Sequence, residues 1–204
     1  MIGIVDYGMG NLGSIRNMLK RIGIQSELIS RPEQVLAAHK LILPGVGAFD
    51  AGMRNLEDSQ LISPLNEAVL GARRVPVLGI CLGMQLMTRS SEEGSLPGLG
   101  WMDARAVKFE PTPDALKVPH MGWSDVLTLR DEPLVRRLPP EPRFYFVHSY
   151  YVRCSAAEDA LLTTRYGIEF HSAFARGNIW GVQFHPEKSH KFGMQLLKNF
   201  AEAC

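Results

Sequence analysis

Residues 75–87 have the sequence VPVLGICLGMQLM, in which an apolar run stops abruptly at a cysteine. Residues 75–80 predict a buried parallel strand, and residues 82–87 predict a helix that begins directly after Cys81. Glycines stand two residues before and two residues after the cysteine, and they permit positive φ angles and close backbone approach. A helix N-terminus also stabilises a thiolate. Most free cysteines are buried structural residues, but this strand-to-helix turn favours Cys81 as a displayed nucleophile.

The segments before this turn alternate between strands and helices. The predicted strands are residues 2–6, 26–30 and 40–43. Two predicted helices begin at Asn11 and Arg31, and a third helical region covers residues 49–70. We expect residues 44–47 to break the third strand, and we expect the last helical region to be interrupted near Ser63-Pro64. Such alternation predicts a parallel sheet with helices on both faces.

The second half of the chain has a different pattern. Predicted strands at hairpin-like spacing are residues 104–110, 125–129, 143–153, 161–165, 168–175 and 178–184. A last helix over 189–203 has its large apolar residues, Phe192, Leu196, Leu197 and Phe200, on one face. We therefore expect an α/β fold with a mostly parallel central sheet flanked by helices and an additional antiparallel strand region. No linker or repeat divides the chain, so residues 1–204 are predicted to form one domain.

Composition argues against several classes of protein. The 204 residues carry a formal net charge of +1, which indicates neither a nucleic-acid nor a membrane partner. Residues 1–6 resemble a strand rather than a secretion signal, and the three cysteines have no metal-like spacing. We expect a reduced, cytoplasmic protein without a metal site or cofactor. Residues 8–13 match a dinucleotide-binding glycine pattern, but the next predicted strand ends in serine instead of an acidic residue.

A cysteine nucleophile needs a base and a group that orients the base. His185-Pro186-Glu187 follows an apolar strand, and on an extended segment residues two apart point to the same side. We therefore predict that His185 and Glu187 complete a catalytic triad with Cys81. Glu169 and His171 have the same spacing and remain an alternative, although their alternating segment favours a solvent-facing role. His39, His120 and His190 have no acidic residue two positions away along the chain.

The loop after the third predicted strand, residues 44–47, reads Pro-Gly-Val-Gly. By itself it is equally well explained as a tight turn. Beside a nucleophilic cysteine, its backbone N–H groups become candidates for stabilising an oxyanion. We predict an oxyanion hole formed by the N–H groups of Val46 and Leu82.

Together these motifs resemble the class I (triad-type) glutamine amidotransferase family. The matching segments are 6–11 (DYGMGN), 44–49 (PGVGAF), 79–85 (GICLGMQ), 119–123 (PHMGW), 146–150 (FVHSY) and 184–189 (FHPEKS). They cover nearly the whole chain. Residues 79–85 and 185–187 specify only the wider family, whereas 6–11 and 119–123 are similar to the glutaminase subunits of imidazole glycerol phosphate synthases. No motif used here departs from the family pattern, and no role is assigned to loops 111–117 and 131–142.

The resemblance implies a substrate, a mechanism and a partner. Cys81 would attack the side-chain amide of glutamine, and ammonia would pass to a separate cyclase subunit in histidine biosynthesis. The substrate-binding residues it implies are Gly47, Gln85, Glu93, His148, Ser149 and Tyr150, and the partner-facing residues are Asn11, Met121, Trp123 and Lys188. Taken alone, Glu93 would be a solvated carboxylate, and Trp123 in a loop is equally well explained by core packing.

The sequence is also compatible with three other functions. The chain could supply ammonia to another synthase, such as one for anthranilate, aminobenzoate or pyridoxal phosphate. It could be a non-catalytic interaction subunit, although Cys81, His185 and Glu187 argue against that. A cysteine peptidase could use the same cysteine turn, and it would cleave peptides without a partner.

Overall fold

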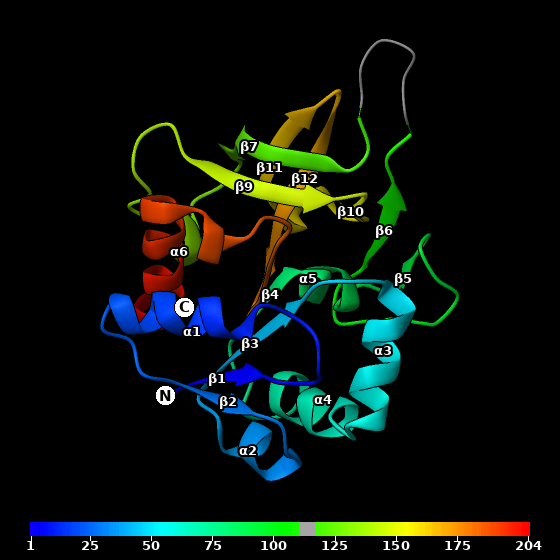
Figure 1. Ribbon diagram of the computed structural model, residues 1–204, viewed down its shortest axis with the longest axis vertical. Coiled ribbons are helices and arrows are strands. Elements are labelled where there is room, and N and C mark those ends of the chain that lie inside the picture. Colours follow the sequence, from blue (N-terminus) through cyan, green and yellow to red (C-terminus); the bar gives the residue numbers. More distant parts are fainter. Residues whose placement is uncertain (111–116) are drawn as a thin grey trace.

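The large sheet begins with a parallel half, as seen in the computed structural model, which describes residues 1–110 and 117–204 (Figure 1). Its strands lie in the order β2-β1-β3-β4-β13. Their bounds are β2 (Ser26–Ile29), β1 (Ile2–Val5), β3 (Lys40–Gly45), β4 (Val77–Cys81) and β13 (Ile179–Val182). All four pairings between them are parallel, including that of β13, whose segment 178–184 was expected among the strands at hairpin-like spacing. The carboxyl ends of β3 and β4 therefore meet at one edge, where α/β sheets place their sites.

A mostly antiparallel half continues the same sheet beyond β13. Its strands are β12 (Ile168–Arg176), β10 (Tyr150–Cys154), β6 (Ala104–Lys108), β5 (Ser90–Ser91), β11 (Ala160–Tyr166) and β8 (Leu127–Thr128). A separate two-stranded antiparallel sheet consists of β7 (His120–Asp125) and β9 (Arg143–His148). The predicted fold class is confirmed in both parts, the parallel sheet and the antiparallel extension.

Helices cover both faces of the parallel half (Figure 1). The helices are α1 (Leu12–Arg21), α2 (Pro32–Ala37), α3 (Phe49–Asp58), α4 (Ile62–Leu70), α5 (Leu82–Leu86) and α6 (His190–Ala203). Ile42 on β3 packs in the core beneath α1 and α6, whereas its neighbours Leu41 and Leu43 pack in the core beneath α2 to α5. This alternation follows from the two-residue period of a strand that is buried on both sides.

Two predicted breaks fall within a few residues of their expected positions. Pro44 does not end β3, because β3 continues to Gly45 and pairs with Ile80 and Cys81. The other neighbour, β1, pairs with β3 only as far as Ile42, so Pro44 stands where β3 has one partner strand, a place that tolerates proline. The helical region is interrupted at residues 59–61 rather than at Ser63-Pro64. These two residues lie in the first turn of α4, where backbone N–H groups have no helical partner.

The predicted strand 143–153 is also wrong as a single element. It is divided at Ser149 into β9 and β10, which belong to different sheets. Met121 and Trp123, expected to lie in a loop, are part of strand β7. Residues 111–116 lie outside the described part of the chain, and residues 131–142 contain a short 3₁₀ turn, η1 (Pro133–Val135).

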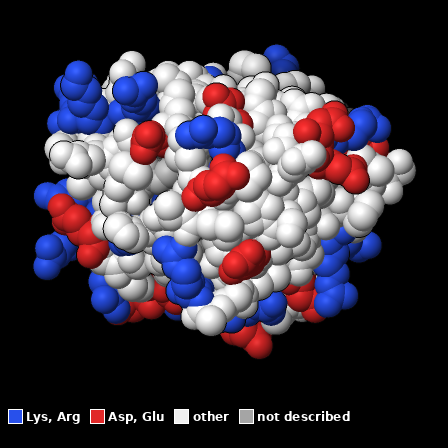
Figure 2. Space-filling model, turned by 90° about the horizontal axis from the view of Figure 1, so that it is seen from below, with Lys and Arg blue, Asp and Glu red and all other residues white. Residues whose placement is uncertain are grey.

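The C-terminal end of α6 is tied to the sheet by Lys40. Its ammonium donates hydrogen bonds to the carbonyls of Phe200, Ala201 and Cys204 at 2.9, 2.8 and 2.5 Å. A cation at this position satisfies carbonyls that have no helical partner and opposes the negative end of the helix dipole. One face of the surface shows basic and acidic groups interspersed (Figure 2). None of the described helices is both long and apolar enough to span a bilayer.

Candidate active site

Cys81 lies at the junction of β4 and α5 in a strained backbone conformation. Its φ and ψ are 54° and −111°, a region that non-glycine residues rarely adopt. The positive φ belongs to the cysteine itself and not to Gly79 or Gly83. Those glycines provide the other predicted property, close approach: a Cβ at Gly79 would lie 2.8 Å from the Met84 nitrogen, and one at Gly83 would collide with the Leu43 carbonyl. The turn therefore displays Cys81 at the end of β4 and against the start of α5.

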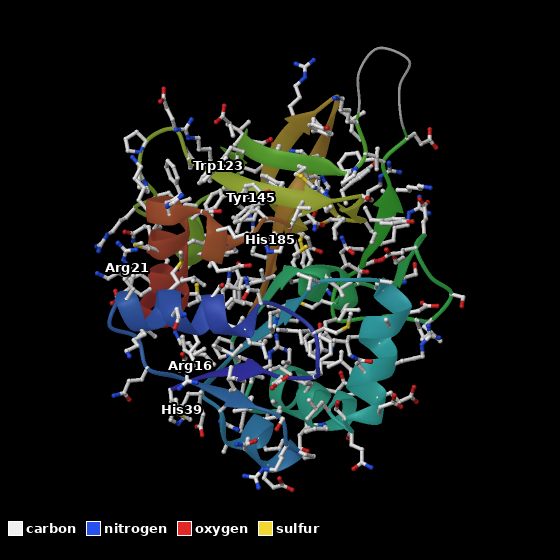
Figure 3. All side chains as sticks on the ribbon, in the orientation of Figure 1. Arg16, Arg21, His39, Trp123, Tyr145 and His185 are labelled. Carbon is white, nitrogen blue, oxygen red and sulfur yellow. The ribbon has the colours of Figure 1, made fainter. Side chains whose placement is uncertain are left out.

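His185 and Glu187 lie together, as predicted, but the local conformation differs from the prediction. His185 Nδ1 is 2.8 Å from Glu187 Oε1, and each side chain is 2% exposed. The segment is not extended, because β13 ends at Val182 and Pro186 begins a 3₁₀ turn, η3 (Pro186–Lys188). The turn brings the carboxylate back to the imidazole. His185 lies in the interior, close to Tyr145, whose carbonyl accepts a hydrogen bond from the His185 backbone N–H (Figure 3).

The electrostatics of this group favour a charged imidazole. Burial by itself lowers the pKa of His185, but the neighbouring Cys81 thiol and Glu187 carboxylate outweigh burial and raise the pKa above its ordinary value. His185 Nδ1 is hydrogen-bonded to Glu187, and His185 Nε2 has no hydrogen-bond partner among the described residues. This arrangement leaves Nε2 available to exchange a proton with Cys81.

A cavity of about 390 Å³ opens above the cysteine. It contains every residue predicted for catalysis, the oxyanion hole or substrate binding except Glu187, which lies behind His185. The lining residues are Val46, Gly47, Cys81, Leu82, Gln85, Glu93, Pro119, Val147, His148, Ser149, Tyr150 and His185. Its size is suitable for a small metabolite. Residues from separate segments of the chain therefore converge on one site.

Glu93 has a structural contact as well as a place in the cavity wall. Its Oε2 accepts a hydrogen bond of 2.8 Å from the backbone N–H of Phe49, the first residue of α3. The carboxylate thus satisfies a free N–H group and interacts favourably with the helix dipole. Its remaining oxygen is available to a ligand.

Two further residues beside Cys81 were not identified from the sequence. Gln183 is fully buried, and its Nε2 lies 3.7 Å from the Cys81 sulfur. Tyr7, also buried, donates a 2.6 Å hydrogen bond to the carbonyl of Pro44. Burial and the nearby Cys81 raise the pKa of Tyr7, so it stays a protonated donor. In the sequence, the only feature that indicated a place for Gln183 in the site is its position two residues before His185.

The alternative pair, Glu169 and His171, has surroundings of its own. Glu169 is exposed, and His171 Nδ1 accepts a hydrogen bond of 3.1 Å from the backbone N–H of Cys154. Neither residue lines the cavity. Across the described ranges, 1–110 and 117–204, no three His, Cys, Asp or Glu side chains form a group that could hold a metal ion.

The residues expected to face a partner are all on the surface. Asn11, Met121, Trp123 and Lys188 are exposed, Met121 by 61% and Trp123 by 44%. They follow one another along a row of packed elements, because α1 contacts η3, η3 contacts β9, and β9 pairs with β7. Asn11 also caps α1 by accepting a hydrogen bond from the Ser14 N–H. Met121 and Trp123 lie on a strand, not in the predicted loop.

Comparisons with known proteins agree with this fold and site. Residues 3–204 match the family model "Glutamine amidotransferase class-I". Solved structures with the same fold include a glutamine amidotransferase from Thermotoga maritima, with a TM-score of 0.65 and 18% identity over 99% of this chain and 80% of that one. A second, also described as a glutamine amidotransferase, has a TM-score of 0.73 and 19% identity over 98% of this chain and 97% of that one.

The fold and the site define a triad-type glutamine amidotransferase, and the chain belongs to the class I family of these proteins. Within the family its relatives are more specific. It is 54% identical to imidazole glycerol phosphate synthase subunit HisH 2 of Methanococcus maripaludis, over 98% of both chains. It is 52% identical to the HisH 2 subunit of Pseudomonas aeruginosa, over 99% of both chains. These matches support the narrower resemblance seen in residues 6–11 and 119–123.

Proposed function

We propose that this chain is the glutaminase subunit of an imidazole glycerol phosphate synthase, acting in the cytoplasm as a single domain. It hydrolyses glutamine to glutamate and ammonia. The ammonia passes to a cyclase subunit, which makes imidazole glycerol phosphate and an aminoimidazole carboxamide ribonucleotide in histidine biosynthesis. The observation that carries this proposal is the buried His185–Glu187 pair beside Cys81 in a cavity of metabolite size.

In this mechanism Cys81 is the nucleophile. His185 takes the thiol proton at Nε2, the sulfur attacks the side-chain amide carbon of glutamine, and the carbonyl oxygen becomes an oxyanion. The N–H groups of Val46 and Leu82 stabilise that oxyanion. His185 then returns the proton to the departing nitrogen, which leaves as ammonia and gives a γ-glutamyl thioester. Water, activated by the same imidazole, hydrolyses the thioester to glutamate and regenerates the thiol.

Glu187 and Gln183 support the nucleophile from either side. Glu187 orients the imidazole and stabilises its charged form, which is consistent with the raised pKa of His185. The amide of Gln183 points a donor at the sulfur. Both groups are buried, so water does not weaken these interactions.

Substrate binding uses the cavity wall. The free oxygen of Glu93 pairs with the substrate ammonium, the strongest contact that the wall offers to a zwitterion. Gly47 lies at a φ of 114° and lets the loop after β3 approach the substrate carbonyl. Gln85, His148, Ser149 and Tyr150 enclose the rest of the molecule.

The exposed row Asn11, Met121, Trp123 and Lys188 faces the cyclase subunit. Exposed tryptophan and methionine are typical centres of protein interfaces. Trp123 is held by stacking on His190, with ring centroids 5.6 Å apart and planes within 9°. Lys188 lies over the ring of Tyr145 at 5.6 Å.

The test is glutamate release by the chain alone and in the presence of the cyclase and its nucleotide ligand. We expect the complex to release glutamate faster than the free chain. Stimulation by an anthranilate, aminobenzoate or pyridoxal phosphate synthase instead of the cyclase would contradict the assignment. Peptide cleavage by the free chain would support the peptidase alternative.

A further inference from the structure

His120, which no predicted role includes, lies in the wall behind the cavity. It is 1% exposed, stands directly opposite His148 in the β7–β9 pairing, and its Nδ1 is 2.9 Å from His148 Nε2. Its ring stacks between Tyr166 and Phe146, with centroid distances of 4.0 and 4.7 Å. Ser124 Oγ lies 2.8 Å from its other nitrogen, Nε2. Both nitrogens of this buried ring therefore have partners.

The direction of each hydrogen bond follows from one fixed acceptor. His148 Nδ1 is 2.7 Å from the carbonyl oxygen of Tyr150, which can only accept. His148 Nδ1 therefore carries a proton. Burial lowers the pKa of His148 to about 3 and that of His120 to about 4, so both rings are neutral near pH 7. His148 Nε2 must then accept from His120 Nδ1–H, and His120 Nε2 must accept from the Ser124 hydroxyl.

The same carbonyl connects this series to the nucleophile. Gln85 Nε2 also donates to the Tyr150 oxygen, at 3.1 Å, and to Gln183 Oε1, at 3.1 Å. Gln183 in turn points its Nε2 at the Cys81 sulfur. Hydrogen bonds thus run without a break from Ser124 on β7 to Cys81 on β4.

The other end of the series reaches the surface row. Along β7, His120 points inward while Met121 and Trp123 are exposed. Among the described strands, β7 pairs only with β9. A displacement of β7 therefore moves the exposed pair and His120 together.

We propose that His120 is a positioning residue of the glutamine pocket, which links the outer face of β7 to the cavity wall through His148 and the carbonyl of Tyr150. The inference rests on the proposed function, because the ligand is glutamine and the protein that covers β7 is the cyclase subunit. Because such coupling is mutual, binding of the partner changes the affinity for glutamine, and binding of glutamine changes the affinity for the partner by the same factor.

The experiment measures glutamine binding by calorimetry, with and without the cyclase subunit, in a Cys81→Ala background that does not consume the ligand. His120→Phe keeps a flat ring but leaves the buried His148 Nε2 without a donor. We expect glutamine to bind about 10-fold more weakly in this variant and the effect of the partner to shrink. His120→Asn places an amide donor near Nδ1 and restores much of the affinity. The matched control, His39→Phe, makes the same change at an exposed histidine and leaves binding unaltered.

Unchanged glutamine affinity in His120→Phe, with and without partner, would overturn the inference. If the parent chain itself binds no glutamine, it is the proposed function that fails. A second readout does not depend on glutamine. Nitrogen NMR of the histidines should show His148 and His120 neutral and protonated at Nδ1, and Ser124→Ala should allow His120 to populate the Nε2–H form. A His148 ring protonated at Nε2 would refute the proposed series of hydrogen bonds. This measurement uses the parent chain, so it tests the inference even if His120→Phe does not fold.

Discussion

Glu187 Oε1 accepts from His185 Nδ1 at 2.8 Å, while Glu187 Oε2 is buried without a hydrogen-bond partner among the described residues. A buried carboxylate with so few partners is costly unless a positive charge lies beside it. The raised pKa of His185 provides that charge. The two side chains therefore act as one ionic unit, and loss of the Glu187 carboxylate would disfavour the charged form of His185.

Glu187→Gln tests this unit. The amide keeps the shape but removes the charge that favours the imidazolium, so we expect kcat for glutamate release to fall by about 10²- to 10⁴-fold, by analogy with other triads. The KM for glutamine should change little, because Glu187 does not line the cavity. Glu202→Gln, an exposed change on α6, is the control. A kcat within about two-fold of the parent value would count against the orienting role.

Stability should fall in mild acid because His148 and His120 are buried as neutral rings. Their lowered pKa values, about 3 and about 4, lie below the value of about 6.5 for an exposed histidine. Between these values the unfolded chain binds protons that the folded chain does not. Unfolding free energy should therefore drop by about 2–4 kcal/mol from pH 7 to pH 5.

His185 does not oppose this trend below its ordinary pKa. Its folded pKa is raised, so it is protonated in both states there, and its own contribution is lost only at higher pH. Urea unfolding at the two pH values measures the effect. His120→Phe should reduce the pH dependence, because one of the buried neutral rings is removed, while His148 and His171, whose pKa values burial also lowers, remain. An unaltered dependence would be inconsistent with a neutral buried His120.

Glu93→Gln separates the two roles of Glu93. The amide oxygen can still accept from the Phe49 N–H, so stability should change by less than about 1 kcal/mol. The charge proposed to pair with the substrate ammonium is lost, so KM should rise by about 10- to 100-fold. Glu92→Gln offers a neighbouring control, since Glu92 accepts from the Lys108 N–H and does not line the cavity. Equal effects of the two changes on KM would argue against the substrate role.

Lys40→Met should destabilise the protein without affecting catalysis. The apolar stem is kept, but three carbonyls at the end of α6 lose their donor, which should lower the unfolding free energy by about 1–2 kcal/mol. Lys198→Met, an exposed change on the same helix, should have a smaller effect. Thermal unfolding and glutamate release together distinguish the two variants.

Local signals were sufficient for much of the fold and for the centre of the site. The apolar run before Cys81 and the flanking glycines define the strand-to-helix turn from sequence alone, and the spacing of His185 and Glu187 indicates a pair. The extended conformation assumed for that pair was wrong, because Pro186 begins a 3₁₀ turn. Glu187 can reach the imidazole of His185 from an extended segment as well as from a 3₁₀ turn. The predicted contact between the two side chains therefore did not depend on the conformation assumed.

What could not be predicted depends on tertiary pairing. Residues 143–153 look like one strand, and only the assignment of β9 and β10 to different sheets reveals the break at Ser149. The role of His120 depends on its position opposite His148, 28 residues away, which no local pattern indicates. The role of Gln183 could not be predicted for the same reason, because it depends on the contact between its amide and the sulfur of Cys81.

The role of Cys81 as the residue that forms the thioester and releases ammonia from glutamine has a direct test. It is glutamate release by the complex with the cyclase subunit, comparing the parent chain with Cys81→Ala. We expect a loss of at least about 10³-fold in the glutamine-dependent reaction, as for other covalent nucleophiles. The cyclase reaction driven by added ammonium salt should be unchanged, since the partner remains bound. Glutamine-dependent turnover by Cys81→Ala at the parent rate would contradict this role.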